Sequence, residues 1–184
     1  NNLTFTITNI SGSGILNASI NDNPLSIVLI SNQSGATSIT IRATDSGSAF
    51  IEDVMDITIN PVNDLPTSQN NTITINENST FNFSQSVFAY TDIETPSLAS
   101  IEVISLPSDG TLRLSGTPIS SGQVILSSQI SDLTYAPVAN ENGTPYTSFL
   151  FSVSDGTDDS TPANTMTFNV NPVNDPPTSS DNSI

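Results

Sequence analysis

Short runs in which apolar and polar residues alternate fill most of the 184-residue chain. In residues 1–62 four such runs occur, and a further short strand is expected around Ser19 and Ile20. Period-two alternation with β-branched residues, broken by Gly, Asn, Ser and Asp about every 8–12 residues, predicts an all-β sandwich or barrel. We find no run with helical periodicity. The four runs are residues 3–7, 25–29, 39–43 and 55–59.

The same pattern continues from residue 63 to residue 174. Phe149, Phe151 and Val153 alternate with serines, so this strand is expected to turn an aromatic face inward. Asp109 and Gly110 predict a tight hairpin turn between two of the strands. The predicted strands are residues 72–75, 80–83, 100–106, 111–114, 123–126, 133–136, 148–154 and 165–171.

One octet occurs twice, as NPVNDLPT at residues 60–67 and as NPVNDPPT at residues 171–178. Each copy follows an alternating strand and leads into a similar new start, which is typical of tandem modules joined by linkers. We therefore predict a first module at 1–62, a complete second module at 63–174, and a linker with the start of a further module at 175–184.

The first module is short, since its five predicted strands fall below the roughly seven that a sandwich of this kind needs. Two explanations stay open. The chain, which begins without Met, is expected to be a piece of a longer protein cut inside a module. Alternatively, another chain supplies the missing edge strands by strand donation.

Charge and composition narrow the class of partner. The chain has eighteen acidic and two basic residues, with a net charge of −16, so its surface repels nucleic acids and anionic membranes and attracts cations. No apolar run approaches the roughly 18 residues of a membrane span, and no signal peptide is visible. Neither nucleic-acid binding nor direct membrane contact is expected.

The sequence lacks most of the residue types that enzymes use for catalysis. There is no His, no Cys and no Lys, which removes the common general bases and most activated nucleophiles. Glu102 and Asp109 are the remaining carboxylate pair, and we interpret them as surface residues of their strands rather than as a glycosidase pair. We therefore predict that the protein is not an enzyme.

Several motifs carry a resemblance to a known family. The octet, with Asn-Asp-x-Pro, resembles the linker of cadherins and of bacterial cadherin-like tandem repeats. The second module, with GTL at 110–112, LTYAP at 133–137 and FLFSVSDG at 149–156, is similar to repeats of large bacterial surface adhesins and to proteoglycan-type repeats. The first module, with SITIRATDSG at 38–47, resembles a dystroglycan-like variety. The resemblance implies tandem Greek-key (cadherin/Ig-like) β-sandwiches joined end to end, with calcium where modules meet.

The residues favour calcium on their own chemistry as well. Ca²⁺ takes six to eight oxygen ligands, and Asn63 and Asp64 offer two on a segment restrained by neighbouring prolines. Asp92 and Glu94 stand two apart, so that both can point to one side of an extended loop. The resemblance assigns Asp92 and Glu94 as the family's paired acidic motif and Asp155 as the acid at the end of the penultimate strand. It implies that all three face Asn63 and Asp64.

The same resemblance assigns other ligands to other junctions. Glu77 would join Asn174 and Asp175 at the next junction, and Asp45 would face the junction before the first module. The linker lacks the second Asn and the extra acid of the cadherin form, and the Asp-Arg-Glu motif has no counterpart. We therefore expect fewer ions or weaker binding, with dissociation constants of about 10⁻⁴–10⁻³ M.

The sequence thus predicts structural or adhesive modules of a long extracellular or cell-surface protein, rigidified by Ca²⁺ and contacting neighbouring modules. Two alternatives remain: a carbohydrate-binding module of a secreted protein, and a subunit of a filament that assembles homotypically by strand donation. Glycan platforms use exposed Trp or Tyr. The chain has no Trp and three Tyr, of which Tyr135 is expected in the core, which favours the structural function.

Overall fold

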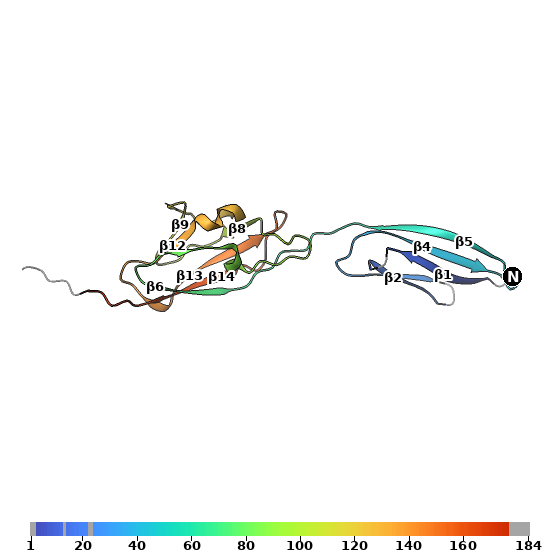
Figure 1. Ribbon diagram of the computed structural model, residues 1–184, viewed down its shortest axis with the longest axis horizontal. Helices are drawn as coiled ribbons and strands as arrows, with labels where there is room; N and C mark the ends of the chain where they lie inside the picture. The colour runs from blue at the N-terminus through green and yellow to red at the C-terminus, as the bar shows by residue number, and fades with distance from the viewer. Residues whose placement is uncertain (1–2, 13, 22–23, 177–184) are drawn as a thin grey trace, which may run out of the picture. The chain divides into compact units, whose positions relative to one another are not determined.

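The computed structural model describes residues 3–12, 14–21 and 24–176 (Figure 1). Within them the regular structure is strand apart from two short 3₁₀ helices, so the predicted all-β class is confirmed. The chain divides into two compact units, Asn1–Asn63 and Asp64–Ile184. Of the third segment that we predicted, 175–184, all but the first two residues lie outside the described part of the chain.

The described residues of the first unit form five strands in two sheets. Ten register pairs join β4 to β5, and the larger sheet has the order β1-β4-β5. The smaller sheet is the antiparallel pair β2-β3. In the described part of this unit, Leu16 and Ile39 are the only buried hydrophobic residues. The strands are β1 (Thr4–Ser11), β2 (Leu16–Ile20), β3 (Leu25–Leu29), β4 (Gly35–Thr44) and β5 (Phe50–Ile59).

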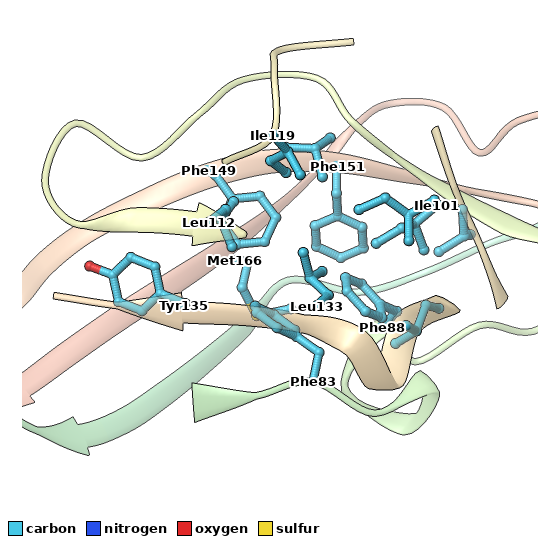
Figure 2. Close-up of a cluster of buried hydrophobic side chains, with 14 of the residues drawn as sticks. Phe83, Phe88, Ile101, Leu112, Ile119, Leu133, Tyr135, Phe149, Phe151 and Met166 are labelled. Atoms are coloured by element: carbon cyan, nitrogen blue, oxygen red, sulfur yellow. The ribbon is translucent and has the colours of Figure 1, made fainter. Parts of the chain in front are cut away.

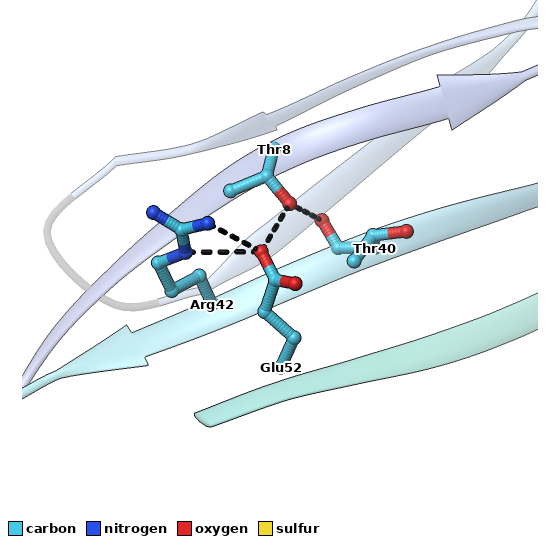
Figure 3. A network of polar contacts seen from close by, with 4 residues as sticks. All are labelled: Thr8, Thr40, Arg42 and Glu52. Atoms are coloured by element: carbon cyan, nitrogen blue, oxygen red, sulfur yellow. Dashed lines mark hydrogen bonds and ion pairs between the residues drawn. The ribbon is translucent and has the colours of Figure 1, made fainter. Parts of the chain in front are cut away.

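A polar network ties the three strands of the larger sheet together (Figure 3). Arg42 and Glu52 are register partners, and two guanidinium nitrogens lie 2.8 and 2.9 Å from one carboxylate oxygen of Glu52. Thr8 donates to the same oxygen at 3.1 Å, and the Arg42 guanidinium lies 4.0 Å from the ring centre of Phe50. The hydrogen bonds from Arg42 and Thr8 lower the pKa of Glu52. Because the Arg42–Glu52 pair is exposed, it adds little to the free energy of folding. We expect it mainly to fix the register between neighbouring strands.

In the second unit, residues 64–176 form nine strands in two sheets. One sheet has the order β11-β8-β13-β14-β6 and the other β10-β9-β12-β7. Among these described strands every pairing is antiparallel except that of β6 with β14. The elements are β6 (Asn71–Asn76), β7 (Phe81–Asn82), η1 (Gln85–Phe88), β8 (Ser100–Val103), β9 (Thr111–Leu114), β10 (Thr117–Pro118), β11 (Gln123–Leu126), η2 (Ser127–Asp132), β12 (Leu133–Ala136), β13 (Gly143–Ser154) and β14 (Asn164–Asn171).

Aromatic side chains fill the space between these two sheets (Figure 2). Phe149 and Phe151 point inward from β13 and are at most 1% exposed, which confirms the aromatic face predicted for this strand. Tyr135, from the opposite sheet, stacks on Phe168 with ring centres 3.8 Å apart. Phe88 meets Phe151 edge-on at 5.1 Å. Contacts between offset or perpendicular rings add to the free energy gained by removing these large side chains from water.

The hairpin predicted at Asp109 and Gly110 is wrong. The strand before it, β8, belongs to one sheet, whereas the strand after it, β9, belongs to the other, so the connection crosses between sheets. Tyr135 holds this crossing, because its hydroxyl donates to the Asp109 carbonyl at 2.9 Å. Burial raises the pKa of the Tyr135 hydroxyl far above its ordinary value, and the expected core position of this residue is confirmed.

Two further differences concern short elements. The strand predicted at residues 100–106 ends at Val103, after which the Ile104 and Ser105 N–H groups both donate to the Leu150 carbonyl. The two 3₁₀ helices, of four and six residues, were not predicted, because such lengths are too short to establish a helical period.

The close approach at Gly110 gives a stability test. Gly110 and Gly116 both have φ near +80°, but a Cβ at Gly110 would lie 2.5 Å from the Tyr135 hydroxyl oxygen, whereas at Gly116 it would meet nothing within 4 Å. We expect Gly116→Ala to cost about 1 kcal/mol from the left-handed conformation alone. Gly110→Ala should cost about 1–3 kcal/mol more, because the crowded neighbours must shift. Urea unfolding of the two variants measures the difference, and equal costs would contradict the tight packing.

Candidate functional site

The first octet is fastened to the second unit beside the predicted acidic motif. Thr67 and Thr91 form an isolated bridge, in which each N–H donates to the other's carbonyl at 2.8 and 2.9 Å. Their hydroxyls are also 2.7 Å apart. This bridge brings the end of the octet to the residue that directly precedes Asp92.

Asp92 is the residue of this region whose environment points most directly to a ligand. Its Oδ1 accepts hydrogen bonds from the N–H groups of Glu94 at 2.9 Å and Thr95 at 2.5 Å, which closes the loop. Its Oδ2 is buried and has no hydrogen-bond partner among the described residues. Buried carboxylate oxygens are almost always partnered, because an unpartnered one has lost its water without compensation.

Glu94 contacts the main chain of the first octet. Its Oε2 accepts a hydrogen bond from the Asp64 N–H at 3.1 Å, so the carboxylate holds the backbone of the octet. The structure therefore brings the Glu94 side chain to the main chain of Asp64. Asn63 is the last residue of the first unit.

Asp155 follows the long strand β13 and is only 9% exposed. Its Oδ1 accepts hydrogen bonds from the N–H groups of Thr157 at 2.6 Å and Asp158 at 2.8 Å. Tyr90 links this residue to Asp92: burial raises the pKa of Tyr90, and the negative charges of Asp92 and Asp155 raise it further. Both carboxylates therefore act on one tyrosine, whose own hydroxyl donates to the Thr95 carbonyl at 2.7 Å.

These residues do not form a ready-made metal cage. Within residues 3–12, 14–21 and 24–176, no group of three or more Asp or Glu side chains is arranged to hold an ion. The region nevertheless fits a hard cation in two respects. The side-chain atoms that could coordinate an ion are carboxylate oxygens, and one of them, Asp92 Oδ2, is buried with no hydrogen-bond partner in the described part of the chain.

Glu77, predicted for the next junction, has a structural role in the second unit. It is 6% exposed, and its Oε1 accepts a hydrogen bond from the Val173 N–H at 2.5 Å. Its own N–H donates to the Asn171 carbonyl at 2.9 Å. Glu77 thus holds the start of the second octet, whereas Asn174 and Asp175 are exposed and share a side-chain to backbone hydrogen bond of 3.4 Å.

Asp45 closes the turn between β4 and β5. Its Oδ1 accepts hydrogen bonds from the N–H groups of Gly47 and Ala49, each at 2.9 Å. A carboxylate that caps a turn in this way explains Asp-Ser-Gly as local turn chemistry. Tyr90 is the residue that we did not assign to this region from the sequence, although it stands two positions before Asp92.

The second unit also carries an open groove of about 550 Å³, which bears on the carbohydrate alternative. Tyr146 lines it, with its hydroxyl fixed to the Glu141 carboxylate at 2.7 Å, and burial followed by that hydrogen bond raises the pKa of Tyr146 to about 12. It is the one aromatic residue among the described residues that line the groove. The others are Leu106, Ser108, Pro145, Thr147, Ser148 and Thr167.

Comparisons with known proteins agree with this architecture. Residues 63–171 match the family model described as a bacterial Ig domain. The EC1-2 structure of human mucin-like protocadherin is 15% identical with a TM-score of 0.50, covering 93% of this chain and 85% of that chain. The EC1-2 structure of human protocadherin-24 is 14% identical with a TM-score of 0.50, covering 95% of this chain and 83% of that chain. At these identities the likeness concerns the fold, an Ig- and cadherin-like β-sandwich.

No curated protein matches the chain. None of the helices in the described part of the chain is long and apolar enough to cross a membrane.

Tyr90, on which Asp92 and Asp155 both act, provides a test of the position of the Asp92 carboxylate. Asp92→Asn removes one of the two charges that act on Tyr90, so we expect the pKa of Tyr90 to fall towards its ordinary value while burial keeps it above that value. Titration of ¹³Cζ-labelled tyrosines by NMR measures the shift, with Tyr90→Phe to assign the signal. Asp109→Asn is the matched control, since Asp109 acts on Tyr135 and Tyr146 instead. An unmoved Tyr90 in Asp92→Asn would contradict this arrangement.

Proposed function

The chain belongs to the bacterial Ig domain family, and on this basis we propose that it provides structural or adhesive modules of an extracellular protein. Its β-sandwich fold, shared with the cadherin-type structures, supports this role. So does the repeated octet, which suits an array of modules whose partners are neighbouring modules. The role is not catalytic, in keeping with a chain that has no His, Cys or Lys.

The finer part of the proposal is that calcium binds at the Asp92 end of the second unit. The observation that carries it is the buried Oδ2 of Asp92, which has no hydrogen-bond partner within the residues that the structure describes. A bound Ca²⁺ would supply positive charge to that oxygen, with Asp155 as a second carboxylate and Glu94 and Asp64 as further oxygen donors. Backbone carbonyls and water commonly complete such a site.

The function of such an ion would be to order the linker. Glu94 already contacts the Asp64 backbone, so a cation shared by these acids would restrain the segment that leads into the second unit. It would also relieve repulsion in a chain with a net charge of −16. Weak binding suffices outside cells: with a dissociation constant of about 1 mM, roughly 10 mM Ca²⁺ stabilises the folded state by about 1.4 kcal/mol.

Calorimetry of the full chain in Ca²⁺ and in EGTA tests the calcium proposal. We expect Ca²⁺ to raise the melting temperature of the wild type by roughly 5 °C, and Asp92→Asn to abolish most of that increase. The Asn variant keeps the Oδ1 acceptor that closes the loop, so it removes the charge without removing the turn. Asp132→Asn, at an exposed acid outside this region, is the control and should retain the full increase.

The EGTA measurement separates a metal ligand from a merely structural acid. If the Asp92 charge is uncompensated without metal, Asp92→Asn should melt at the same or a higher temperature than the wild type in EGTA. A wild-type melting temperature that is the same in Ca²⁺ and EGTA would refute calcium binding. A variant that melts lower than the wild type in both buffers would show that Asp92 is structural.

A further inference from the structure

Asn142 and Gly143 form the one Asn-Gly pair in the sequence, and they lie where a turn enters β13. Asn142 is exposed and directly precedes the first paired residue of that strand. Gly143 pairs with Val170, but the next register pair joins Thr147 to Phe168, so the ladder is interrupted directly after Gly143. Regular β pairing therefore restrains the backbone at this point only weakly.

An asparagine followed by glycine is prone to one spontaneous reaction. The backbone nitrogen of Gly143 attacks Cγ of Asn142, and the absence of a Cβ on the glycine leaves that approach open. A bond forms between this nitrogen and Cγ, the Cγ–Nδ2 bond breaks, and the proton of the Gly143 N–H leaves with the amine as ammonia. Water then opens the resulting succinimide ring and yields aspartate or isoaspartate. The reaction consumes water alone.

The two Asp-Gly pairs of the second unit are held more firmly. At Asp155, Oδ1 accepts hydrogen bonds from two backbone N–H groups, and the Gly156 N–H donates to Ser154 Oγ at 3.3 Å. At Asp109, the carbonyl accepts from Tyr135, whose ring crowds Gly110. A carboxylate is also a poorer target for the attacking nitrogen than an amide. Asn142 is therefore the position that structure and chemistry both favour.

The Asn142 amide faces the carboxylate that holds the second octet. Its Nδ2 donates to Glu77 Oε2 over a long 3.5 Å, while Glu77 Oε1 accepts from the Val173 N–H at 2.5 Å. Conversion to aspartate replaces the Nδ2 donor by a carboxylate oxygen, so two negative groups face each other. Because Glu77 is only 6% exposed, water screens their repulsion poorly. The carboxylate that is displaced is the one that binds Val173.

We propose that Asn142 is a site of spontaneous chemical modification, at which conversion to aspartate or isoaspartate weakens the hold of Glu77 on the second octet. The reactive pair and the contact that it controls lie within residues that the structure describes. The modification adds one negative charge and loosens the chain where β14 passes into the octet. This inference does not depend on calcium binding at Asp92.

Peptide mapping of the incubated full chain tests the modification. The chain is held in mildly alkaline buffer with EGTA and then cut with a protease that cleaves after Glu. Cleavage after Glu141 places Asn140 and Asn142 in separate peptides, so Asn140 is an internal control. We expect acid and isoaspartate forms to accumulate at Asn142 about tenfold faster than at Asn140. Tandem mass spectrometry locates the altered residue.

Gly143→Ala is the matched variant for the reaction step. A Cβ at this position would lie 3.4 Å from the Pro145 carbonyl oxygen, an ordinary contact, so the variant should fold. The added Cβ hinders the attack on Asn142, and we expect conversion there to slow about tenfold.

Two Asp variants test the consequence by hydrogen exchange followed with NMR. Asn142→Asp places the product charge beside Glu77, so the Val173 amide should exchange about five- to tenfold faster while amides of β14 keep wild-type rates. Asn140→Asp adds the same charge two residues away but keeps the oxygen that accepts from Asn78 Nδ2 at 2.9 Å. It should leave the exchange of Val173 unchanged.

Two sets of results would overturn the proposal. Conversion at Asn142 that is no faster than at Asn140, or that Gly143→Ala does not slow, would show that this pair is not a modification site. In Asn142→Asp, a Val173 amide that exchanges at the wild-type rate, or only as part of an equal acceleration throughout the second unit, would show that the modification does not act through Glu77.

Discussion

Burial of the inward faces of two β-sheets against each other is the constraint on which this structure depends. In the second unit, aromatic rings from both sheets fill the space between the inward faces. The ring of Tyr135 is buried among them while its hydroxyl keeps a hydrogen bond to the Asp109 carbonyl. In the described part of the first unit, Leu16 and Ile39 are the hydrophobic residues that are buried in this way. Since hydrophobic burial is the main source of folding free energy, the described residues of the second unit contribute much more of it than those of the first.

Five acidic residues of this chain hold its own backbone, namely Asp45, Glu77, Asp92, Glu94 and Asp155. Glu94 accepts from Asp64 in the first octet, and Glu77 accepts from Val173 in the second. Asp45, Asp92 and Asp155 each close a turn by accepting two backbone N–H groups. Asp92 differs from the others because its second oxygen is buried and unpartnered among the described residues, so it is the acid that local structure does not explain.

Much of the fold could be predicted from the sequence, because period-two alternation states directly which face of a strand is buried. The aromatic face of β13 and the core position of Tyr135 followed from that rule. The crossing at Asp109 and Gly110 did not, because a Gly after an Asp suits a hairpin and a crossover equally, and only the contact with Tyr135 decides between them. The side-chain roles of Glu77 and Glu94 were also beyond the sequence, since an acid near a linker can bind either an ion or a backbone N–H.

The parallel pairing of β6 with β14 has a mechanical consequence. These are the first and last of the strands described in the second unit, and six register pairs join them. Because they run in the same direction, a pull on the two ends of this unit draws the strands past each other along their length. All the hydrogen bonds between them then bear the load together, instead of opening one after another as in a peeled hairpin. A module of this design would resist tension well beyond what its thermodynamic stability suggests.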